Sequence, residues 1–275
     1  MAYFYKYKNT KHSKYTMTKL IFLGNGAGQT DKQETVSFII DNSETILFET
    51  GPSVIRQLAR AGYSPTEIDA VFISHSHGDH LLGFPYFIFV DSIERLLKKK
   101  GTRNMPLITL LDIGNFLQKM IEFCYPSTVF PTKIELLEAP TDSFKTFTLS
   151  DCKITTAPVI HSVQTIGARV ELPDCVIAYS SDSIYCENVI ELARNCDLLI
   201  HSAFCQSANK DLAAKLMHAT SMDAGKIAQK ANAKNLALVD ISLFVTDENI
   251  LIEDAKQFFD GEVFIPKELE ELEVG

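Results

Sequence analysis

The sequence Val71-Phe-Ile-Ser-His-Ser-His-Gly-Asp-His80 decides the fold prediction. Its first four residues are apolar or small and predict a buried strand, and the polar residues after them predict a loop at the end of that strand. Two imidazoles spaced two residues apart, those of His75 and His77, can converge on one cation, while Asp79 and His80 turn toward a second. Imidazole suits zinc, iron and related transition ions, and a carboxylate adds a harder oxygen ligand. The stretch therefore predicts a metal centre at the end of a strand.

The composition predicts a soluble globular protein with a large core. The chain has 275 residues, of which 46% are hydrophobic and 22% charged, which suits one α/β domain over residues 17–275. Residues 1–16 are rich in Tyr and Lys and lack the apolar region of a secretory signal, so we expect a disordered or peripheral extension there. No apolar run reaches the roughly 18 residues that a membrane span needs, so we expect no membrane partner.

The net charge and the cysteines limit which partners and which cellular compartment we expect. The net charge of −9 opposes extensive binding of nucleic acid, although it leaves room for a small basic patch or for phosphates held by metal. Six cysteines are scattered through apolar segments without CxxC spacing. This usage predicts small buried core residues in a reducing, cytoplasmic environment.

The order of elements predicts two packed sheets with helices outside, because two strand-rich stretches are each followed by helices. The strand Lys19–Gly24 leads into a tight glycine turn that we place near the site and do not interpret as a nucleotide cradle. A helix is predicted over Asp91–Lys100, preceded by the apolar segment Leu81–Val90, which suits the core, a substrate cleft or a homodimer interface. The acidic tail Lys267–Gly275 is predicted to be solvated.

Further ligand candidates lie at the ends of apolar strands downstream. His161, Asp182, His201 and Asp240 each follow such a strand. Any one of them alone is more commonly a hydrogen-bonded core or turn residue. Their order behind the His75–His80 loop makes them candidates for the metal centre.

Together these motifs resemble the metallo-β-lactamase fold superfamily, and the chain is most similar to its ribonuclease Z branch. The resemblance covers Leu20 to about Ser242. The HxHxDH loop is highly specific for the superfamily, and the other motifs indicate the branch. The segments that carry the resemblance are Phe22–Gly28, Phe72–His80, His161, Tyr179–Asp182, Asp197–His201, His218–Thr220 and Leu238–Ser242.

The resemblance implies an α/β fold, a four-layer αβ/βα sandwich, with two divalent metal ions, usually zinc, at one edge. It implies that the first ion binds His75, His77 and His161, the second binds Asp79 and His80, and Asp182 bridges both. Asp79 and His218 would be the catalytic side chains. Water held between two cations has its pKa lowered toward ~7 and becomes a nucleophile, so the implied reaction is hydrolysis of an ester-like bond.

Two site positions depart from the family pattern. Asp240 stands where the family has its last histidine ligand, so the second site either holds three carboxylates around His80, which favours manganese or iron, or is weak or empty. Ser202 stands where the ribonuclease Z pattern has a glutamate that works with the histidine matching His218. The sequence therefore predicts that His218 lacks its carboxylate partner.

A third departure bears on the substrate. Only twenty residues separate His161 from Asp182, where the bacterial ribonuclease Z pattern carries its long arm for transfer RNA. Such a stretch has room for a hairpin and no arm, so transfer RNA processing is not expected. The leading hypothesis is a hydrolase of small-molecule or short phosphodiesters. The alternatives are hydrolysis of a carboxylic ester, lactone or thioester, and a metal-binding protein whose catalysis has decayed.

Overall fold

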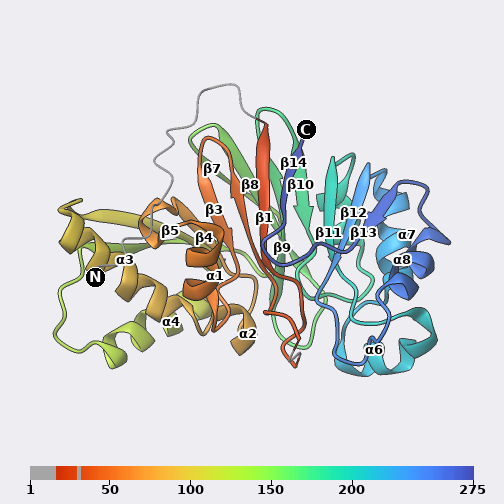
Figure 1. Cartoon of the computed structure of the whole chain (residues 1–275), viewed down its shortest axis with the longest axis horizontal. Helices are drawn as coiled ribbons and strands as arrows, with labels where there is room; N and C mark the ends of the chain where they lie inside the picture. Colours follow the sequence, from red (N-terminus) through yellow and green to blue (C-terminus); the bar gives the residue numbers. More distant parts are fainter. Residues whose placement is uncertain (1–16, 30–31) are drawn as a thin grey trace.

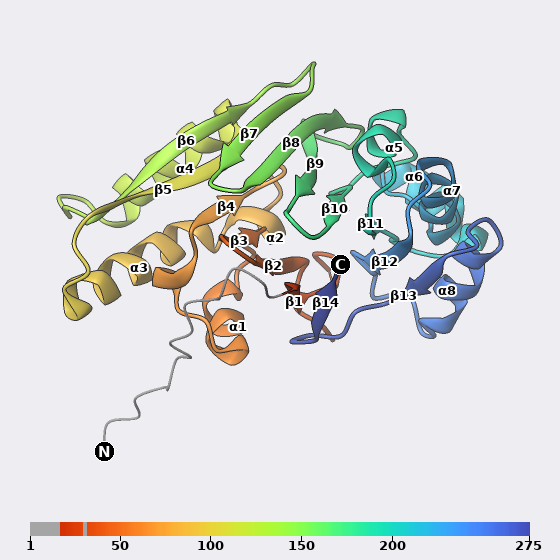
Figure 2. The ribbon, with the colours of Figure 1, turned by 90° about the horizontal axis from the view of Figure 1, so that it is seen from above.

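The computed structural model describes residues 17–29 and 32–275, and the extension expected over residues 1–16 lies outside this part of the chain. Two seven-stranded sheets pack against each other. Helices α1 and α4 cover the first sheet, and α5, α7 and α8 cover the second (Figures 1 and 2). The prediction of a four-layer αβ/βα sandwich is confirmed.

The first sheet comes mainly from the N-terminal half of the chain. Its strands, in spatial order, are β14 (Glu271–Val274), β1 (Thr18–Gly24), β2 (Ser37–Asp41), β3 (Thr45–Phe48), β4 (Ala70–Phe72), β5 (Arg103–Leu110) and β6 (Thr132–Ala139). The run from β3 to β6 is parallel. Its helices are α1 (Val54–Ala61), α2 (Gly78–Leu81), α3 (Phe84–Lys98) and α4 (Leu111–Cys124).

The second sheet comes from the C-terminal half. Its strands, in spatial order, are β13 (Glu262–Phe264), β12 (Asn235–Val239), β11 (Leu198–Ser202), β10 (Val176–Tyr179), β9 (Thr165–Glu171), β8 (Cys152–Val159) and β7 (Lys145–Leu149). The strands β10 to β13 are parallel. Its helices are α5 (Glu187–Ala193), α6 (Lys210–Leu216), α7 (Ser221–Ala231) and α8 (Asn249–Lys256). The carboxyl ends of parallel strands meet at one edge of each sheet, which is where ligands bind in open α/β sheets.

Aromatic rings join the two sheets near that edge. The rings of Phe38 and Phe48 stack with centroids 4.7 Å apart, and Tyr179 from the second sheet meets Phe38 edge-on at 5.1 Å. Each such pair adds about 0.5–1.5 kcal/mol beyond area burial. This packing fixes the ends of β3 and β10 relative to each other.

Two predictions about elements are wrong. The helix expected from Asp91 begins at Phe84, so most of the apolar segment is its first half, with Phe87 and Ile88 buried. The tail expected to be solvated contains β14, which pairs with β1 (Figure 1). Leu272 and Val274 pack against the core at alternate positions between glutamates. Two apolar residues at alternate positions are enough to bury one face of a short edge strand. In the sequence, the glutamates between them make the segment look like a solvated tail.

The structure also tests the predictions that the cysteines are buried and that no segment spans a membrane. All six cysteines are free, and five are buried as expected, but Cys124 at the end of α4 is exposed. Within residues 17–29 and 32–275, no helix is both long and apolar enough to cross a membrane.

Candidate metal centre

The histidine loop leaves the carboxyl end of β4 and turns at once into α2. His77 is the N-cap residue of α2, so Asp79 and His80 lie within its single turn. The hydroxyl of Ser74 lies 2.8 Å from Nδ1 of His75, which leaves Nε2 of that ring for the centre. The backbone therefore presents the imidazoles from the strand end and the helical turn.

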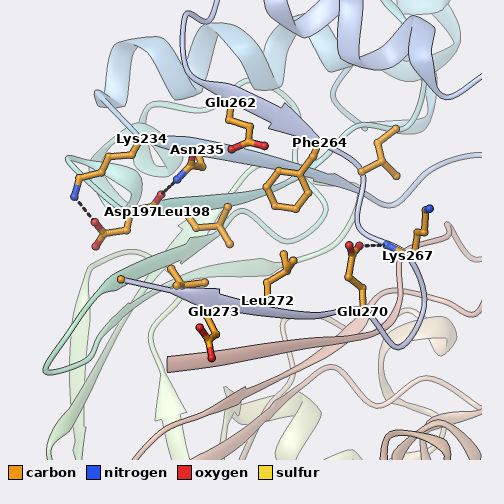
Figure 3. Close-up of a pocket in the computed structure, with 13 residues that line it drawn as sticks. Asp197, Leu198, Lys234, Asn235, Glu262, Phe264, Lys267, Glu270, Leu272 and Glu273 are labelled. Atoms are coloured by element: carbon orange, nitrogen blue, oxygen red, sulfur yellow. Dashed lines mark hydrogen bonds and ion pairs between the residues drawn. The ribbon is translucent and has the colours of Figure 1, made fainter. Parts of the chain in front are cut away.

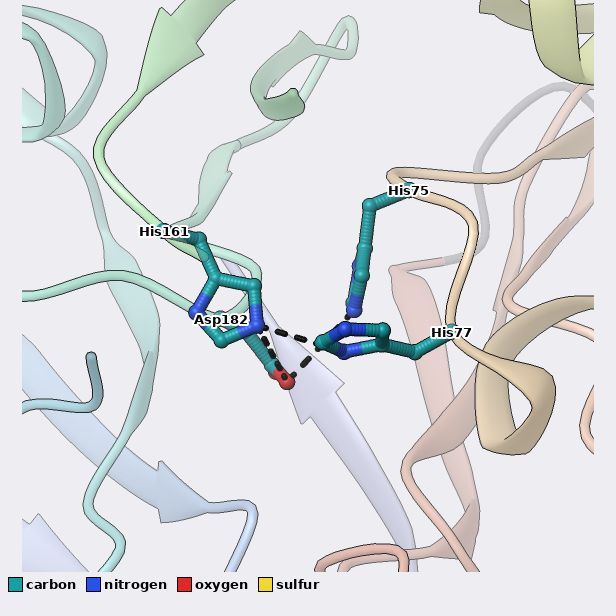
Figure 4. A group of neighbouring side chains, drawn as sticks. All are labelled: His75, His77, His161 and Asp182. Carbon is teal, nitrogen blue, oxygen red and sulfur yellow. Dashed lines mark hydrogen bonds and ion pairs between the residues drawn. The ribbon is translucent and has the colours of Figure 1, made fainter. Parts of the chain in front are cut away.

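Four side chains from both sheets converge beyond this loop. Figure 4 shows His75 and His77 on one side and His161 on the other, with the Asp182 carboxylate between them. One donor atom from each of these four residues lies within 4.8 Å of every other. The Oδ2 atom of Asp182 is 3.7 Å from Nε2 of His75 and 3.9 Å from Nε2 of His161. Donors sharing a tetrahedral ion at about 2.1 Å lie roughly 3.4 Å apart, so this set suits one zinc-sized cation.

The remaining loop residues, Asp79 and His80, also lie close to Asp182. Nε2 of His80 is 3.5 Å from Oδ2 of Asp182 and 3.4 Å from Oδ2 of Asp79. The same carboxylate oxygen thus faces both halves of the histidine loop, which is the position of a bridging ligand.

Unsatisfied buried atoms indicate that the cluster is built for cations. Nε2 of His75 and Oδ1 of Asp182 are buried without a hydrogen-bond partner. Such atoms cost about 1–3 kcal/mol each when nothing compensates them. A bound cation at this position would satisfy the imidazole lone pair and the carboxylate, so the residues present fit the group.

The electrostatics keep most of the ligand candidates in the state that binds metal. Burial lowers the pKa of His75 well below its ordinary value, and His80 adds to the effect. Burial also lowers the pKa of His161. Burial by itself would raise the pKa of Asp182, but the neighbouring His80 outweighs it and holds that pKa well below its usual range. Neutral imidazoles and ionised carboxylates are the forms that coordinate.

Glu49 is a site residue that the sequence analysis missed. It follows β3, is fully buried, and its Oε2 lies 3.5 Å from Nδ1 of His80 and 3.3 Å from the backbone nitrogen of Ser74. Burial alone would lower the pKa of His80, but Asp182 and Glu49 raise it well above its ordinary value. Glu49 ends an apolar strand, as Asp182 does, so the same sequence pattern could have identified it.

The glycine turn after β1 lies beside the loop, as predicted. A Cβ at Gly28 would lie 2.5 Å from Oδ2 of Asp79. Only glycine lets the turn approach this carboxylate so closely.

A second cluster surrounds His218, and it corrects a prediction. Nδ1 of His218 lies 2.9 Å from Oδ2 of Asp240, and the Ser202 hydroxyl donates to the same oxygen at 2.8 Å. The expectation that His218 lacks a carboxylate partner is wrong, because Asp240 supplies one. Burial alone would lower the pKa of His218, but Asp240 outweighs it and raises this pKa to about 9. Burial, together with Asp182, raises the pKa of Asp240 to about 6.

His201 lies away from both clusters. Its ring is buried, and its Nδ1–H donates to the carbonyl of Ser202 at 2.6 Å. Burial lowers its pKa to about 4. Neither group of metal-capable side chains found among the described residues contains it.

A hollow of about 430 Å³ lies at the opposite end of the second sheet. It is lined by the start of β12 at Asn235, by Phe264 and by Leu272 (Figure 3). Asp240 follows the other end of β12. The hollow is therefore separate from the metal centre.

Residues 44–241 match the beta-lactamase superfamily domain. A ribonuclease Z of Bacillus licheniformis is 26% identical, over 88% of this chain and 94% of its own length.

Two solved structures show the same fold. The metallo-beta-lactamase fold protein YhfI from Bacillus subtilis superposes with a TM-score of 0.81 at 25% identity, covering 94% of this chain and 100% of that one. The short form of human tRNase Z gives a TM-score of 0.76 at 20% identity, covering 94% and 99%. Because the superfamily domain matches most of this chain, the chain belongs to the metallo-β-lactamase fold superfamily, in the ribonuclease Z-like branch.

Proposed function

We propose that this protein is a metal-dependent hydrolase that cleaves phosphodiesters. The observation that carries the proposal is the convergence of His75, His77, His161 and Asp182 within 4.8 Å. Two bound cations would lower the pKa of water toward ~7 and neutralise charge that develops on a phosphoryl group. The ribonuclease Z relatives support the choice of phosphodiesters over other esters.

The residues divide into two ligand sets. His75, His77 and His161 hold the first ion, and Asp79 with His80 hold the second. Asp182 faces both sets through its Oδ2 atom. The imidazole-rich first site suits zinc, and the carboxylate-rich second site accepts zinc, manganese or iron.

His218 is the candidate proton donor to the leaving group. Its ring lies beside the first ligand set, with its centroid 4.9 Å from that of His161. Oδ2 of Asp240 lies 2.9 Å from Nδ1, so we assign the proton donation to Nε2. Proton donation by a positioned imidazole is worth about 10²–10⁴ in rate.

The substrate is a small-molecule or short phosphodiester. The net charge of −9 disfavours a long phosphate backbone. The stretch between His161 and Asp182 folds into β9 and β10, so it carries no arm for gripping a large nucleic acid.

A substrate panel tests the proposed function. Purified protein loaded with zinc or manganese is assayed on bis(p-nitrophenyl) phosphate, on p-nitrophenyl acetate, and on a lactone and a thioester. We expect turnover of the phosphodiester, lost in His75→Ala and unchanged in Glu253→Gln, which alters an exposed residue of α8. Preferred turnover of the carboxylic esters would establish the alternative hydrolase, and bound metal without turnover would establish decayed catalysis.

We also propose a cytoplasmic homodimer. Apolar side chains are exposed on α3, which follows the metal loop and α2, and on α4, which packs against α3. They are Tyr86, Leu96, Leu97, Phe116 and Phe123. Exposed apolar surface of this kind is typical of association sites. Light scattering of the purified protein gives the mass, and Leu97→Glu with Phe123→Glu should convert a dimer to a monomer.

A further inference from the structure

We infer that Asp240 is the positioning partner of His218 and is not a ligand of the second cation. This inference rests on the proposed function, because it assigns a role within the same reaction. It explains the departures from the family pattern at Ser202 and Asp240 together. The carboxylate that the pattern has at position 202 is supplied here from the end of the neighbouring strand, at position 240.

The sheet makes this exchange of position feasible. β11 and β12 are parallel neighbours, with Ser202 paired with Val239, the residue before Asp240. Neighbouring strands lie about 4.8 Å apart. A carboxylate at the end of either strand therefore reaches the same imidazole. In this chain the last position of β11 holds the Ser202 hydroxyl, which donates to the Asp240 carboxylate directly after β12.

The Asp240 carboxylate is already engaged on the His218 side. Its Oδ2 atom has the His218 ring at 2.9 Å and the Ser202 hydroxyl at 2.8 Å. One Asp240 carboxylate oxygen lies within 4.8 Å of donor atoms of Asp182 and His218. The short polar contacts of this carboxylate are thus with the proton donor and with the Ser202 hydroxyl.

The His218 ring is held so that this contact can orient it. Phe204 stacks on the ring with centroids 4.7 Å apart and planes 24° apart. The backbone nitrogen of His218 donates to Ala213 at 2.9 Å, and two residues later Thr220 caps α7 through a reciprocal pair with Asp223. Stacking fixes the ring plane, and the Asp240 carboxylate lies against Nδ1 of the ring.

Measurements of metal content distinguish a positioning role of Asp240 from a role as metal ligand. Wild type, Asp240→Asn, Asp240→Ala and Asp79→Ala are equilibrated with zinc, passed over a desalting column and measured by plasma mass spectrometry. We expect both Asp240 variants to retain the metal content of wild type, and Asp79→Ala to lose metal. Loss of an ion in Asp240→Ala would overturn the inference.

The leaving group provides the kinetic readout. p-Nitrophenolate needs little protonation, whereas a more basic phenol or an alcohol needs a proton from the enzyme. We expect Asp240→Asn and His218→Ala each to reduce the rate on the poorer leaving group, relative to the p-nitrophenyl ester, by about 100-fold. The double variant should lose no more than either single variant, since the two residues act as one unit. An equal loss on all leaving groups would contradict the assignment.

A third measurement keeps the inference separate from the proposed function. The Nδ1 proton of His218 should give a downfield NMR signal that disappears in His218→Ala and in Asp240→Ala but persists in Glu253→Gln. If no phosphodiester is cleaved by wild type, the proposed function fails, while the NMR signal and the metal content still decide whether Asp240 pairs with His218. Persistence of the signal in Asp240→Ala would overturn the pairing.

Discussion

The Oε2 atom of Glu49 lies 3.5 Å from Nδ1 of His80, and both side chains are buried. The contact joins the end of β3 to the single turn of α2. A carboxylate at the far nitrogen of a ligating imidazole fixes the ring and makes it a better donor. Glu49 itself has φ of 60°, in a region that is unfavourable for its residue type. Strain of this kind is found where function requires a particular direction of the side chain.

Glu49→Gln should weaken the metal centre without removing it. The variant keeps the shape of the side chain but loses the charge beside His80, so we expect the affinity for the more weakly held ion to fall by about 10–100-fold. Competition with a chromophoric chelator measures this affinity. Glu253→Gln, in an exposed position, is the matched control, and equal affinities in the two variants would show that Glu49 does not support His80.

Asp240→His should move metal content and proton donation in opposite directions. The imidazole adds a neutral nitrogen ligand near Asp182 but removes the partner of His218. We expect more bound metal after desalting and a lower rate with poor leaving groups, by about 100-fold. Asp240→Asn is the control that removes the partner without adding a ligand. An Asp240→His variant with unchanged metal content would be inconsistent with this account.

Gly28→Ala should disturb Asp79 specifically. The added Cβ would lie 2.5 Å from the Asp79 carboxylate, which must then leave its present position beside His80. We expect reduced metal content with a small change in melting temperature. Gly101→Ala is the control, because its φ of 71° makes alanine strained there while the space around it is open. Equal metal content in both variants would argue against a role for the turn.

His201 should make the protein sensitive to acid in the absence of metal. Burial lowers the pKa of His201 to about 4, below its unfolded value of about 6.5. The unfolded state therefore binds a proton first as pH falls, and stability that is complete above pH ~6.5 is lost progressively toward pH ~4. The shift corresponds to about 3 kcal/mol.

Urea unfolding at pH 7.5 and pH 4.5 tests this prediction. The free energy of unfolding of wild type should fall more between the two pH values than that of His201→Phe, by up to about 3 kcal/mol. The comparison uses the difference between pH values, so a general cost of the substitution cancels. Parallel losses in the two proteins would exclude His201 as the source.

The fold and most of the centre were predictable because their signals are local. The strand that runs into His75–His80 fixes a loop of ligands within six residues, and the same strand-end pattern pointed to His161 and Asp182. Glu49 carried that pattern too. The start of α3 could not be predicted from the sequence. Its first half is almost entirely apolar, and such a segment can be a buried strand or a buried helix.

What the sequence by itself determined is the set of side chains at the strand ends and the metal chemistry they can support. Only the tertiary structure decided which of them face one another. Ser202 and Asp240 are almost 40 residues apart, yet they end adjacent parallel strands, and this pairing brings the carboxylate to His218. A sequence records that a carboxylate is absent at one position, whereas the sheet determines that a neighbouring strand replaces it, because contact depends on register across the sheet rather than on separation along the chain.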